Sequence, residues 1–291
     1  MDSVRCYTYT RFVRASERGM QTEYDMRIMC LNGWGGTLHQ ELVEYVSAEQ
    51  PDVLCLQEVV HTPTAEKDWM TYRDGDHILP QRTRFFADVA SVLPDHIGVF
   101  CPAAQGVLWD EDVSVPSQWG LATFVRSSIP IIGQIQGFVH KGFSPNGFGD
   151  HPRSRSAHAV RLFDFERGWP ITIAHMHGLR DLEGKHDTPE RRDQAIRLRG
   201  LVRQVAEPED RIVICGDFNV EPDSETFDIF AEDGLTDLIQ ARGVTSTRTS
   251  HYKKPLRFAD YMLTNRTLEI LDFTVVTDPE VSDHCPLLLE V

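Results

Sequence analysis

The chain has 291 residues, 41% of them hydrophobic and 25% charged, a composition that argues against a disordered or fibrous protein. Its formal net charge of −15 at pH 7 argues against a protein that grips duplex DNA through a broad basic surface. No segment has the apolar length of a membrane span, and the six scattered cysteines form no CxxC pair. We therefore expect a cytoplasmic protein with reduced thiols.

The amino-terminal half alternates between predicted strands and helices. Residues 1–25 are polar and lack the apolar core of a signal peptide, so we interpret them as a flexible leader. A polar loop is expected over 61–80. The hydrophobic pattern further predicts a strand over 26–31, a helix over 37–49, a strand over 52–56, a helix over 82–93, and strands over 97–101, 120–126 and 131–139.

The carboxyl-terminal half begins with a loop over 141–152 that is rich in glycine, serine and proline. Thr188 and Pro189 supply a helix cap and a first-turn proline for a helix over 188–205. The remaining predicted elements are a helix over 225–232 and strands over 157–165, 171–176, 211–215, 258–263, 268–276 and 286–291.

No internal repeat or linker divides the chain, so we expect a single α/β catalytic domain over 26–291. Two domains divided near residue 150 are the weaker alternative, because the candidate site residues fall on both sides of that point.

The strongest local motif is Gly216-Asp217-Phe218-Asn219, which directly follows an apolar run. The run predicts a buried strand, so Asp217 and Asn219 should emerge together at its carboxyl end. An aspartate there can activate a water or bind Mg²⁺, and an asparagine can donate to a phosphoryl oxygen. The alternative is an Asx turn that caps the following helix.

Two other polar residues close apolar runs in the same manner. Glu58 ends the run that begins at Asp52, and Asn32 follows the first predicted strand. Oxygen donors in such positions suit a hard cation. The alternatives are a surface glutamate at a strand end and, for Asn32, a turn residue of a glycine-rich loop that lacks nucleotide-binding spacing.

A third group lies near the carboxyl end. Asp283 precedes His284, and an acid beside a histidine can orient the imidazole and stabilise its charged form, although a structural histidine is the common alternative. Asp260 is a charge inside an otherwise apolar strand. We expect it to pair with a polar group, such as a histidine of the same site.

Together these residues resemble the endonuclease/exonuclease/phosphatase superfamily, which includes pancreatic-type deoxyribonuclease, abasic-site endonucleases, neutral sphingomyelinases and inositol-polyphosphate 5-phosphatases. The resemblance spans about residues 26 to 291. It rests on six segments in the family's order: Asn32, Gln57-Glu58, Ala174-His175, Gly216–Asn219, Asp260-Tyr261 and Ser282–His284. It implies a four-layered α/β sandwich in which two packed, mainly antiparallel β-sheets are flanked by helices.

The resemblance also implies Mg²⁺- or Mn²⁺-dependent cleavage of a phosphate ester. Under it, Glu58 is the principal metal ligand, with Asn32 beside it and Asp283 as a metal-binding or orienting group. Asp217 orients or deprotonates the attacking water, and Asn219 holds the phosphate.

The histidines complete the implied catalytic set. His284 would donate to the phosphoryl oxygens, Asp260 would pair with His284 or His175, and His175 would contact the scissile phosphate or the leaving oxygen. Because alternate strand residues share a face, His175 and His177 together are a candidate transition-metal pair. We favour His175 alone at the site, with His177 in the loop beyond the strand.

Arg155 opens the strand after the loop at 141–152, and we expect its guanidinium to bind phosphate oxygens of the substrate. For the neighbouring Arg153, a solvated loop charge is an equally good interpretation.

The sequence therefore predicts a metal-dependent phosphoesterase that hydrolyses a phosphodiester or phosphomonoester by in-line attack of water. The acidic composition favours a small molecule or lipid head group as substrate, with a nuclease acting on DNA or RNA as the alternative. A catalytically silent phosphate-binding scaffold is the alternative of another class. No obligate protein partner is inferred.

Overall fold

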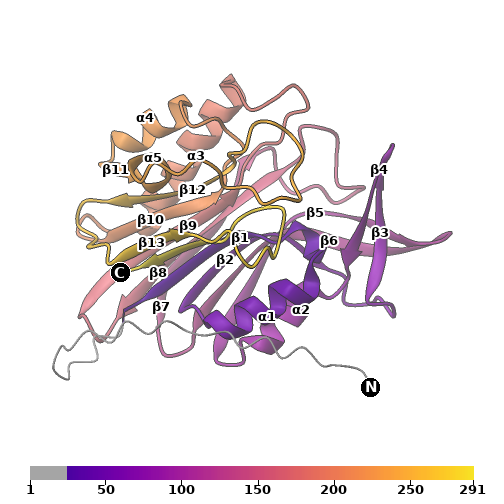
Figure 1. Ribbon diagram of the computed structural model, residues 1–291, viewed down its shortest axis with the longest axis horizontal. Helices are drawn as coiled ribbons and strands as arrows, with labels where there is room; N and C mark the ends of the chain where they lie inside the picture. Colours follow the sequence, from indigo (N-terminus) through magenta and orange to yellow (C-terminus); the bar gives the residue numbers. More distant parts are fainter. Residues whose placement is uncertain (1–24) are drawn as a thin grey trace, which may run out of the picture.

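Two β-sheets packed face to face form the centre of the protein, and helices cover both outer faces (Figure 1). The computed structural model describes residues 25–291. The first sheet contains β1 (Arg27–Asn32), β2 (Val53–His61), β3 (Trp69–Asp74), β4 (His77–Arg82), β5 (His96–Asp110), β6 (Val113–Arg126), β13 (Asp272–Val275) and β14 (Leu287–Glu290). The second contains β7 (Ile131–His140), β8 (Arg155–Asp164), β9 (Trp169–His177), β10 (Arg211–Asp217), β11 (Leu235–Asp237) and β12 (Asp260–Asn265).

The strand order is β13-β14-β1-β2-β6-β5-β3-β4 in the eight-stranded sheet and β11-β12-β10-β9-β8-β7 in the six-stranded sheet. All neighbouring pairs are antiparallel except β1 with β2 and β9 with β10. The expected sandwich of two mainly antiparallel sheets is thereby confirmed.

Helices form the two outer layers of the sandwich (Figure 1). The first sheet is covered by α1 (His39–Glu49) and α2 (Phe85–Val92), and the second by α3 (Pro189–Val205), α4 (Glu225–Ala231) and α5 (Leu238–Ala241). α3 begins as predicted, because the Thr188 side chain accepts a hydrogen bond from the Arg191 backbone N–H and Pro189 occupies the first turn.

The central strands are buried on both faces, which explains their nearly continuous apolar sequence. In β1, Ile28 and Cys30 face the core between the sheets, whereas Met29 and Leu31 face the core under α1 and α2. This alternation follows from the two-residue period of a strand. The packing of the two sheets brings β1 and β2 against β9 and β10. The carboxyl ends of both parallel pairs therefore lie close together.

The segment at 61–80 differs from the expected loop. It contains the β3–β4 hairpin, and β5 and β6 are 15 and 14 residues long instead of the shorter strands predicted. These strands project beyond the second sheet (Figure 1). Their outer parts leave apolar side chains such as Ile78, Val107 and Val113 exposed, so the sequence there lacks the division into a buried apolar face and an exposed polar face on which the prediction relies.

Some expectations are not tested by the described residues. The predicted leader lies outside them apart from Asp25, and the single catalytic domain stays a prediction. Between residues 25 and 291, no helix is long and apolar enough to cross a membrane. The cysteines described there are all free and buried: Cys30, Cys55, Cys101, Cys215 and Cys285.

Candidate active site

Polar side chains from both sheets meet where the parallel strand pairs end. Asn32 closes β1 and Asp217 closes β10. The Asn32 Nδ2 donates to Asp217 Oδ2 at 3.0 Å and to Glu58 Oε1 at 3.2 Å, which links the two sheets directly. Ser282 adds a second link along the chain, because its hydroxyl donates to the Asn32 carbonyl at 2.7 Å across 250 residues of sequence.

Glu58 reaches this edge through a distortion of β2. The strand continues to His61, so Glu58 does not end it as the sequence suggested. Instead, the pairing with β6 shifts register between Leu56 and Val59, and Glu58 has a φ of 54°. A β-bulge with a non-glycine residue at positive φ is unfavourable and is characteristic of functional sites.

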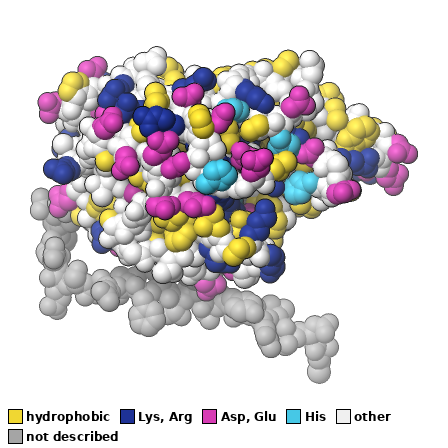
Figure 2. All heavy atoms as spheres, turned by 90° about the horizontal axis from the view of Figure 1, so that it is seen from above, with side chains coloured by type: hydrophobic (Ala, Val, Ile, Leu, Met, Phe, Trp, Pro, Cys, Tyr) yellow, Lys and Arg dark blue, Asp and Glu magenta, His cyan; other side chains and the backbone are white. Residues whose placement is uncertain are grey.

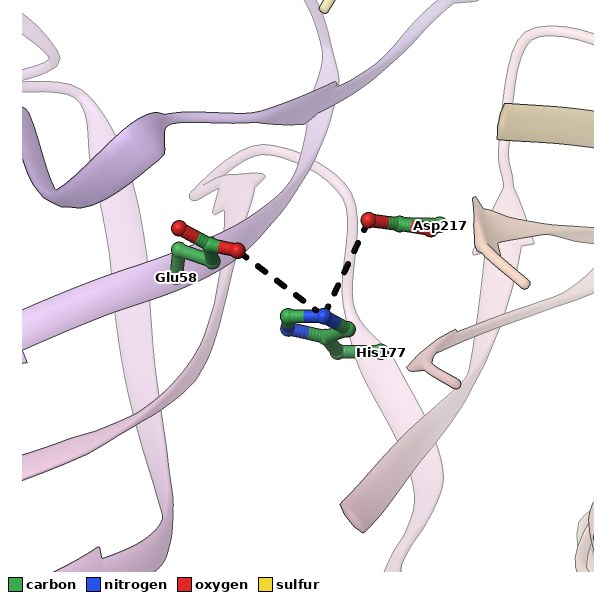
Figure 3. A group of neighbouring side chains, drawn as sticks. All are labelled: Glu58, His177 and Asp217. Atoms are coloured by element: carbon green, nitrogen blue, oxygen red, sulfur yellow. Dashed lines mark ion pairs between the residues drawn. The ribbon is translucent and has the colours of Figure 1, made fainter. Parts of the chain in front are cut away.

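His177 lies between the two carboxylates (Figure 3). Its Nε2 is 3.7 Å from Asp217 Oδ2 and 3.9 Å from Glu58 Oε1, while its Nδ1 is buried and has no hydrogen-bond partner in the described structure. Burial, reinforced by the Arg155 charge, holds the pKa of His177 well below its usual value. The imidazole is therefore neutral near pH 7.

The prediction that His175 alone faces the site is wrong. His175 is fully buried between the sheets, where its Nε2 contacts Thr123 Oγ1 at 2.8 Å and its Nδ1 contacts Gln57 at 3.2 Å. Both histidines share one face of β9, but the strand extends to His177 and places that residue nearer the open edge. Both ring nitrogens of His175 have buried polar partners, as expected for a structural histidine. Its complete burial leaves no access for a substrate.

His284 and Asp260 form a buried pair beside Asp217. Both carboxylate oxygens of Asp260 lie 2.8 Å from His284 Nδ1, which confirms one of the two pairings considered for Asp260. Since the carboxylate can only accept, Nδ1 carries the proton and Nε2 points toward Asp217 Oδ2, 3.7 Å away. Burial lowers the pKa of His284 to about 4, and the nearby Arg248 adds to this effect.

Arg248 is the main site residue that the sequence did not reveal. Its Nη1 donates to Asp283 Oδ2 at 2.9 Å and also to His284 Nε2, while its buried Nε has no partner in the described structure. Lys185 lies close by and donates to the Phe258 carbonyl, and burial lowers its pKa to about 8. The only feature of the sequence that could have revealed Arg248 is the concentration of basic residues over 242–257, which stands out in an acidic chain.

The turn after β10 positions Asp217. A Cβ at Gly216 would lie 2.2 Å from the Met176 carbonyl oxygen, so only glycine fits there. The Asn219 backbone N–H donates to Asp217 Oδ1 at 3.1 Å, which is the Asx-turn geometry considered as an alternative. Asn219 is nearly fully buried, with a φ of 53°. The turn thus fixes the Asp217 carboxylate through the backbone of Asn219.

The donor set fits a divalent cation. Burial, together with the charges of Asp283 and Asp217, raises the pKa of Glu58 to about 7, and the buried Asp283 Oδ1 has no hydrogen-bond partner in the described structure. Such a concentration of carboxylates needs a positive charge, and hard cations prefer these oxygen donors. Among residues 25–291, the groups of three acids or histidines whose ligand atoms all lie within 4.8 Å of one another are Glu58–His177–Asp217 and Asp217–Asp260–His284. On the face drawn in Figure 2, histidine and acidic side chains gather next to each other.

A family model gives this geometry a context. The model of the Endonuclease/Exonuclease/phosphatase family matches residues 30–284. The chain belongs to this family. Its members are hydrolases that act on phosphoesters and usually use a divalent metal. The match confirms the family resemblance seen in the sequence.

Solved structures share the same fold over nearly the whole chain. The mannosyl-6-phosphatase of Bacteroides thetaiotaomicron is 13% identical, with a TM-score of 0.64 over 91% of this chain and 99% of that chain. The catalytic domain of human Nocturnin, solved with a sulfate anion, is 21% identical, with a TM-score of 0.59 over 91% and 92%. TDP2 from D. rerio, complexed with a single-strand DNA product, is 15% identical, with a TM-score of 0.61 over 92% and 99%. A comparison with curated protein sequences finds no match.

Proposed function

We propose that this protein is a divalent-metal-dependent phosphoesterase that hydrolyses a phosphomonoester or phosphodiester. The observation that carries the proposal is the convergence of Glu58, Asp217 and His177 beside the buried His284–Asp260 pair. A silent phosphate-binding scaffold has no chemical need for two buried acids, one partly buried acid and two neutral histidines around one point.

Glu58 and Asp283 would hold the cation, which when bound would neutralise charge on the phosphoryl oxygens. In the described conformation Asn32 presents its Nδ2 to Glu58 and Asp217, and its Oδ1 accepts from the Trp34 N–H. This orientation supports a role in fixing the two carboxylates, rather than the ligand role inferred from the resemblance.

Asp217 would orient the attacking water and accept its proton. Its Oδ1 is held by the Asn219 N–H and its Oδ2 by the Asn32 amide, so the carboxylate cannot rotate freely. His177 Nε2 and His284 Nε2 both lie 3.7 Å from Asp217 Oδ2, close to the carboxylate that would orient this water. In-line attack requires this kind of fixed orientation.

The phosphoryl oxygens would accept hydrogen bonds from Arg248, His284 and Asn219. Arg248 and His284 already point at each other through Nη1 and Nε2, and a bound phosphate would take both as donors. The phosphate charge would favour protonation of His284, because Asp260 stabilises the imidazolium through Nδ1.

A small molecule or lipid head group is our preferred substrate class. The net charge of −15 disfavours extended contact with a nucleic acid backbone, and a cavity of about 420 Å³ opens beside Glu58 and His177. The relatives with this fold include both a mannosyl-6-phosphatase and a protein bound to a DNA product, so a nuclease remains the second candidate. A cytoplasmic location is part of the same proposal.

The function is tested by measuring hydrolysis across a panel with Mg²⁺ or Mn²⁺. The panel contains p-nitrophenyl phosphate, bis-(p-nitrophenyl) phosphate, sphingomyelin, inositol phosphates, plasmid DNA and an abasic duplex. We expect turnover of at least one small ester, and the preferred member identifies the substrate class. Turnover of the DNA substrates alone would favour the nuclease, and no turnover of any member would contradict the enzyme proposal.

Metal removal gives a prediction independent of substrate. Because the cation would bind only the folded site, adding Mg²⁺ at about 100 times its Kd to chelator-treated protein should stabilise it by about 2.7 kcal/mol. We expect an upward shift of the melting temperature and recovery of turnover. Glu58→Gln should lose most of the shift, whereas Glu232→Gln, an exposed change on another surface, should keep it. An equal shift in both variants would place the cation elsewhere.

The two histidines of β9 should respond differently to substitution. His175→Ala removes buried hydrogen bonds to Gln57 and Thr123, which keep only their contacts with the Cys55 carbonyl and His158, and it should lower the unfolding free energy by about 1–3 kcal/mol. His177→Ala should lower kcat/KM strongly and change the unfolding free energy little, because His177 has no hydrogen bond shorter than 3.5 Å in the described structure. Urea titration and initial rates separate the effects, and the reverse pattern would contradict the assignment.

A further inference from the structure

A cavity of about 420 Å³ extends from the candidate active site toward the β3–β4 hairpin. It shares Glu58 and His177 with the site, so a phosphoester held there would have the rest of its structure in this space. The remaining walls come from β3 to β6, the segment before β8, and the turn after β9. The residues used below are Tyr72, Leu79, Trp119, Phe148, Arg153 and Arg155.

Arg155 is a buried cation without a direct ion pair, and the Glu58 and Asp217 carboxylates attract it only from a greater distance. Only 4% of the residue is exposed, its Nε has no hydrogen-bond partner, and its Nη1 makes one long bond of 3.5 Å to the Ser154 carbonyl. Within residues 25–291, no carboxylate oxygen lies within 4.0 Å of its guanidinium. Burial lowers its pKa to about 10. A buried charge without a hydrogen-bonded counter-ion is costly, and an anion on the ligand would stabilise it.

Two other arginines with little exposure have acceptors within the protein, and Arg180, which also lines the cavity, is exposed to solvent. Arg153 lines the same cavity, but it forms an ion pair with Asp74 at 3.0 Å and donates to the Tyr72 hydroxyl. Arg191 is fully buried, yet it donates to three backbone carbonyls. Because both have acceptors within the protein, only Arg155 of the three is left with donors for a ligand.

The position of Arg155 is fixed by an aromatic side chain. Its guanidinium lies 5.0 Å from the centre of the Trp119 ring, and that ring contacts His177 at 5.2 Å. Phe148 and Tyr72 pack against each other at 5.6 Å on the wall of the same cavity, beside Leu79. A flat apolar group would therefore find partly exposed aromatic surface between the active site and the hairpin.

We propose that this cavity recognises the non-phosphoryl part of a small phosphoester, which carries a flat apolar body and a second anionic group, a carboxylate or a phosphate, paired with Arg155. This inference rests on the proposed function for the place of the scissile phosphate. It goes further by defining the substrate class as a compact molecule with two separated anions. Arg155 acts in it as a specificity-determining residue, since a bidentate guanidinium suits both anions.

The test compares aryl phosphates that differ only in the second anion. The kcat/KM values of phenyl phosphate and biphenyl phosphate are compared with those of their para-carboxylate and para-phosphate derivatives. The set therefore tests two kinds of second anion and two lengths of the aromatic group. With the wild-type protein, we expect at least one doubly anionic ester to exceed its parent by about tenfold or more in kcat/KM, the value of one good charge-assisted contact. Equal rates for all parents and derivatives would overturn the proposal.

Variants identify the residue responsible. Arg155→Met should lower kcat/KM for the preferred doubly anionic ester at least about tenfold more than for its parent. Arg153→Met should keep most of the preference, because Arg153 is already paired with Asp74. Arg211→Met is a matched control, since Arg211 stacks on Trp169 at 4.3 Å outside the cavity. An equal loss for both esters in Arg155→Met would place Arg155 on the scissile phosphate and overturn the proposal.

Two further readouts keep the inference separate from catalysis. In chelator-treated protein, calorimetry should show tighter binding of 4-carboxyphenylphosphonate than of phenylphosphonate, and Arg155→Met should abolish the difference. This result would hold even if no ester were hydrolysed, in which case the proposed function alone would fail. The melting temperature of Arg155→Met should match or exceed that of the wild type, because an unpaired buried charge is removed. A clear decrease would identify a structural residue and overturn the proposal.

Discussion

Asp217→Asn should reduce kcat/KM by about 10²- to 10⁴-fold, the range associated with loss of a general base. The substituted side chain keeps an oxygen that can accept from the Asn219 N–H, so the turn after β10 should be retained. It loses the negative charge that raises the pKa of Glu58 and that would receive the proton of the water. The measurement is the initial rate on the preferred ester, together with a thermal unfolding curve.

The matched control for this variant is Asp223→Asn, which changes an exposed aspartate six residues farther along the same segment. Its rate should stay within about twofold of the wild type, since a surface substitution away from the site changes little. Activity of Asp217→Asn within about threefold of the wild type would remove Asp217 from the general-base role. An unfolded Asp217→Asn protein would instead show that the buried carboxylate is structural.

His284→Ala and Asp260→Asn should show effects that are not additive. His284→Ala removes a donor to the phosphoryl oxygens and should lower kcat/KM by about 10²- to 10³-fold. Asp260→Asn should lower it by about 10- to 100-fold, because the amide no longer holds the imidazole tautomer through Nδ1 or stabilises its charged form. The double variant should be no slower than His284→Ala alone, since Asp260 acts through the histidine.

A double-mutant cycle on kcat/KM measures this coupling. His39→Ala serves as the control, because His39 lies on α1 and contacts Asp88 away from the site. Additive losses in the double variant would mean that Asp260 acts independently of His284. A pH profile adds a second check, since Asp260→Asn should move the pH at which His284 takes up a proton to a lower value.

The central strands of both sheets could be predicted because they are apolar on both faces, whereas the sandwich itself was implied by the family resemblance. The motif at Asp217 and Asn219 was also recognisable, since Gly216 and the apolar run before it define where the strand ends. By contrast, nothing in the sequence marks the bulge that turns Glu58 toward the site, because a register shift depends on the partner strand β6.

The histidine of β9 was misassigned for a related reason. His175 and His177 are two residues apart and therefore lie on the same face of β9. Which of them is buried depends on where the strand ends and on the packing of Thr123 and Gln57 against His175. Arg248 was missed because it lies in a loop whose path is set by contacts with the Asp283-His284 segment. Site residues supplied by loops and by distant strands have no local pattern in the sequence.

The strand order also determines when this site can exist. β14 pairs with β1, and the Ser282 hydroxyl binds the Asn32 carbonyl across 250 residues. During synthesis, β1 can pair early with β2, but its other neighbour, β14, is made more than 200 residues later. A growing chain holds Glu58 and Asn32 long before it has His284, so the assembled set of acids and histidines cannot form on the nascent chain until that last segment has emerged from the ribosome.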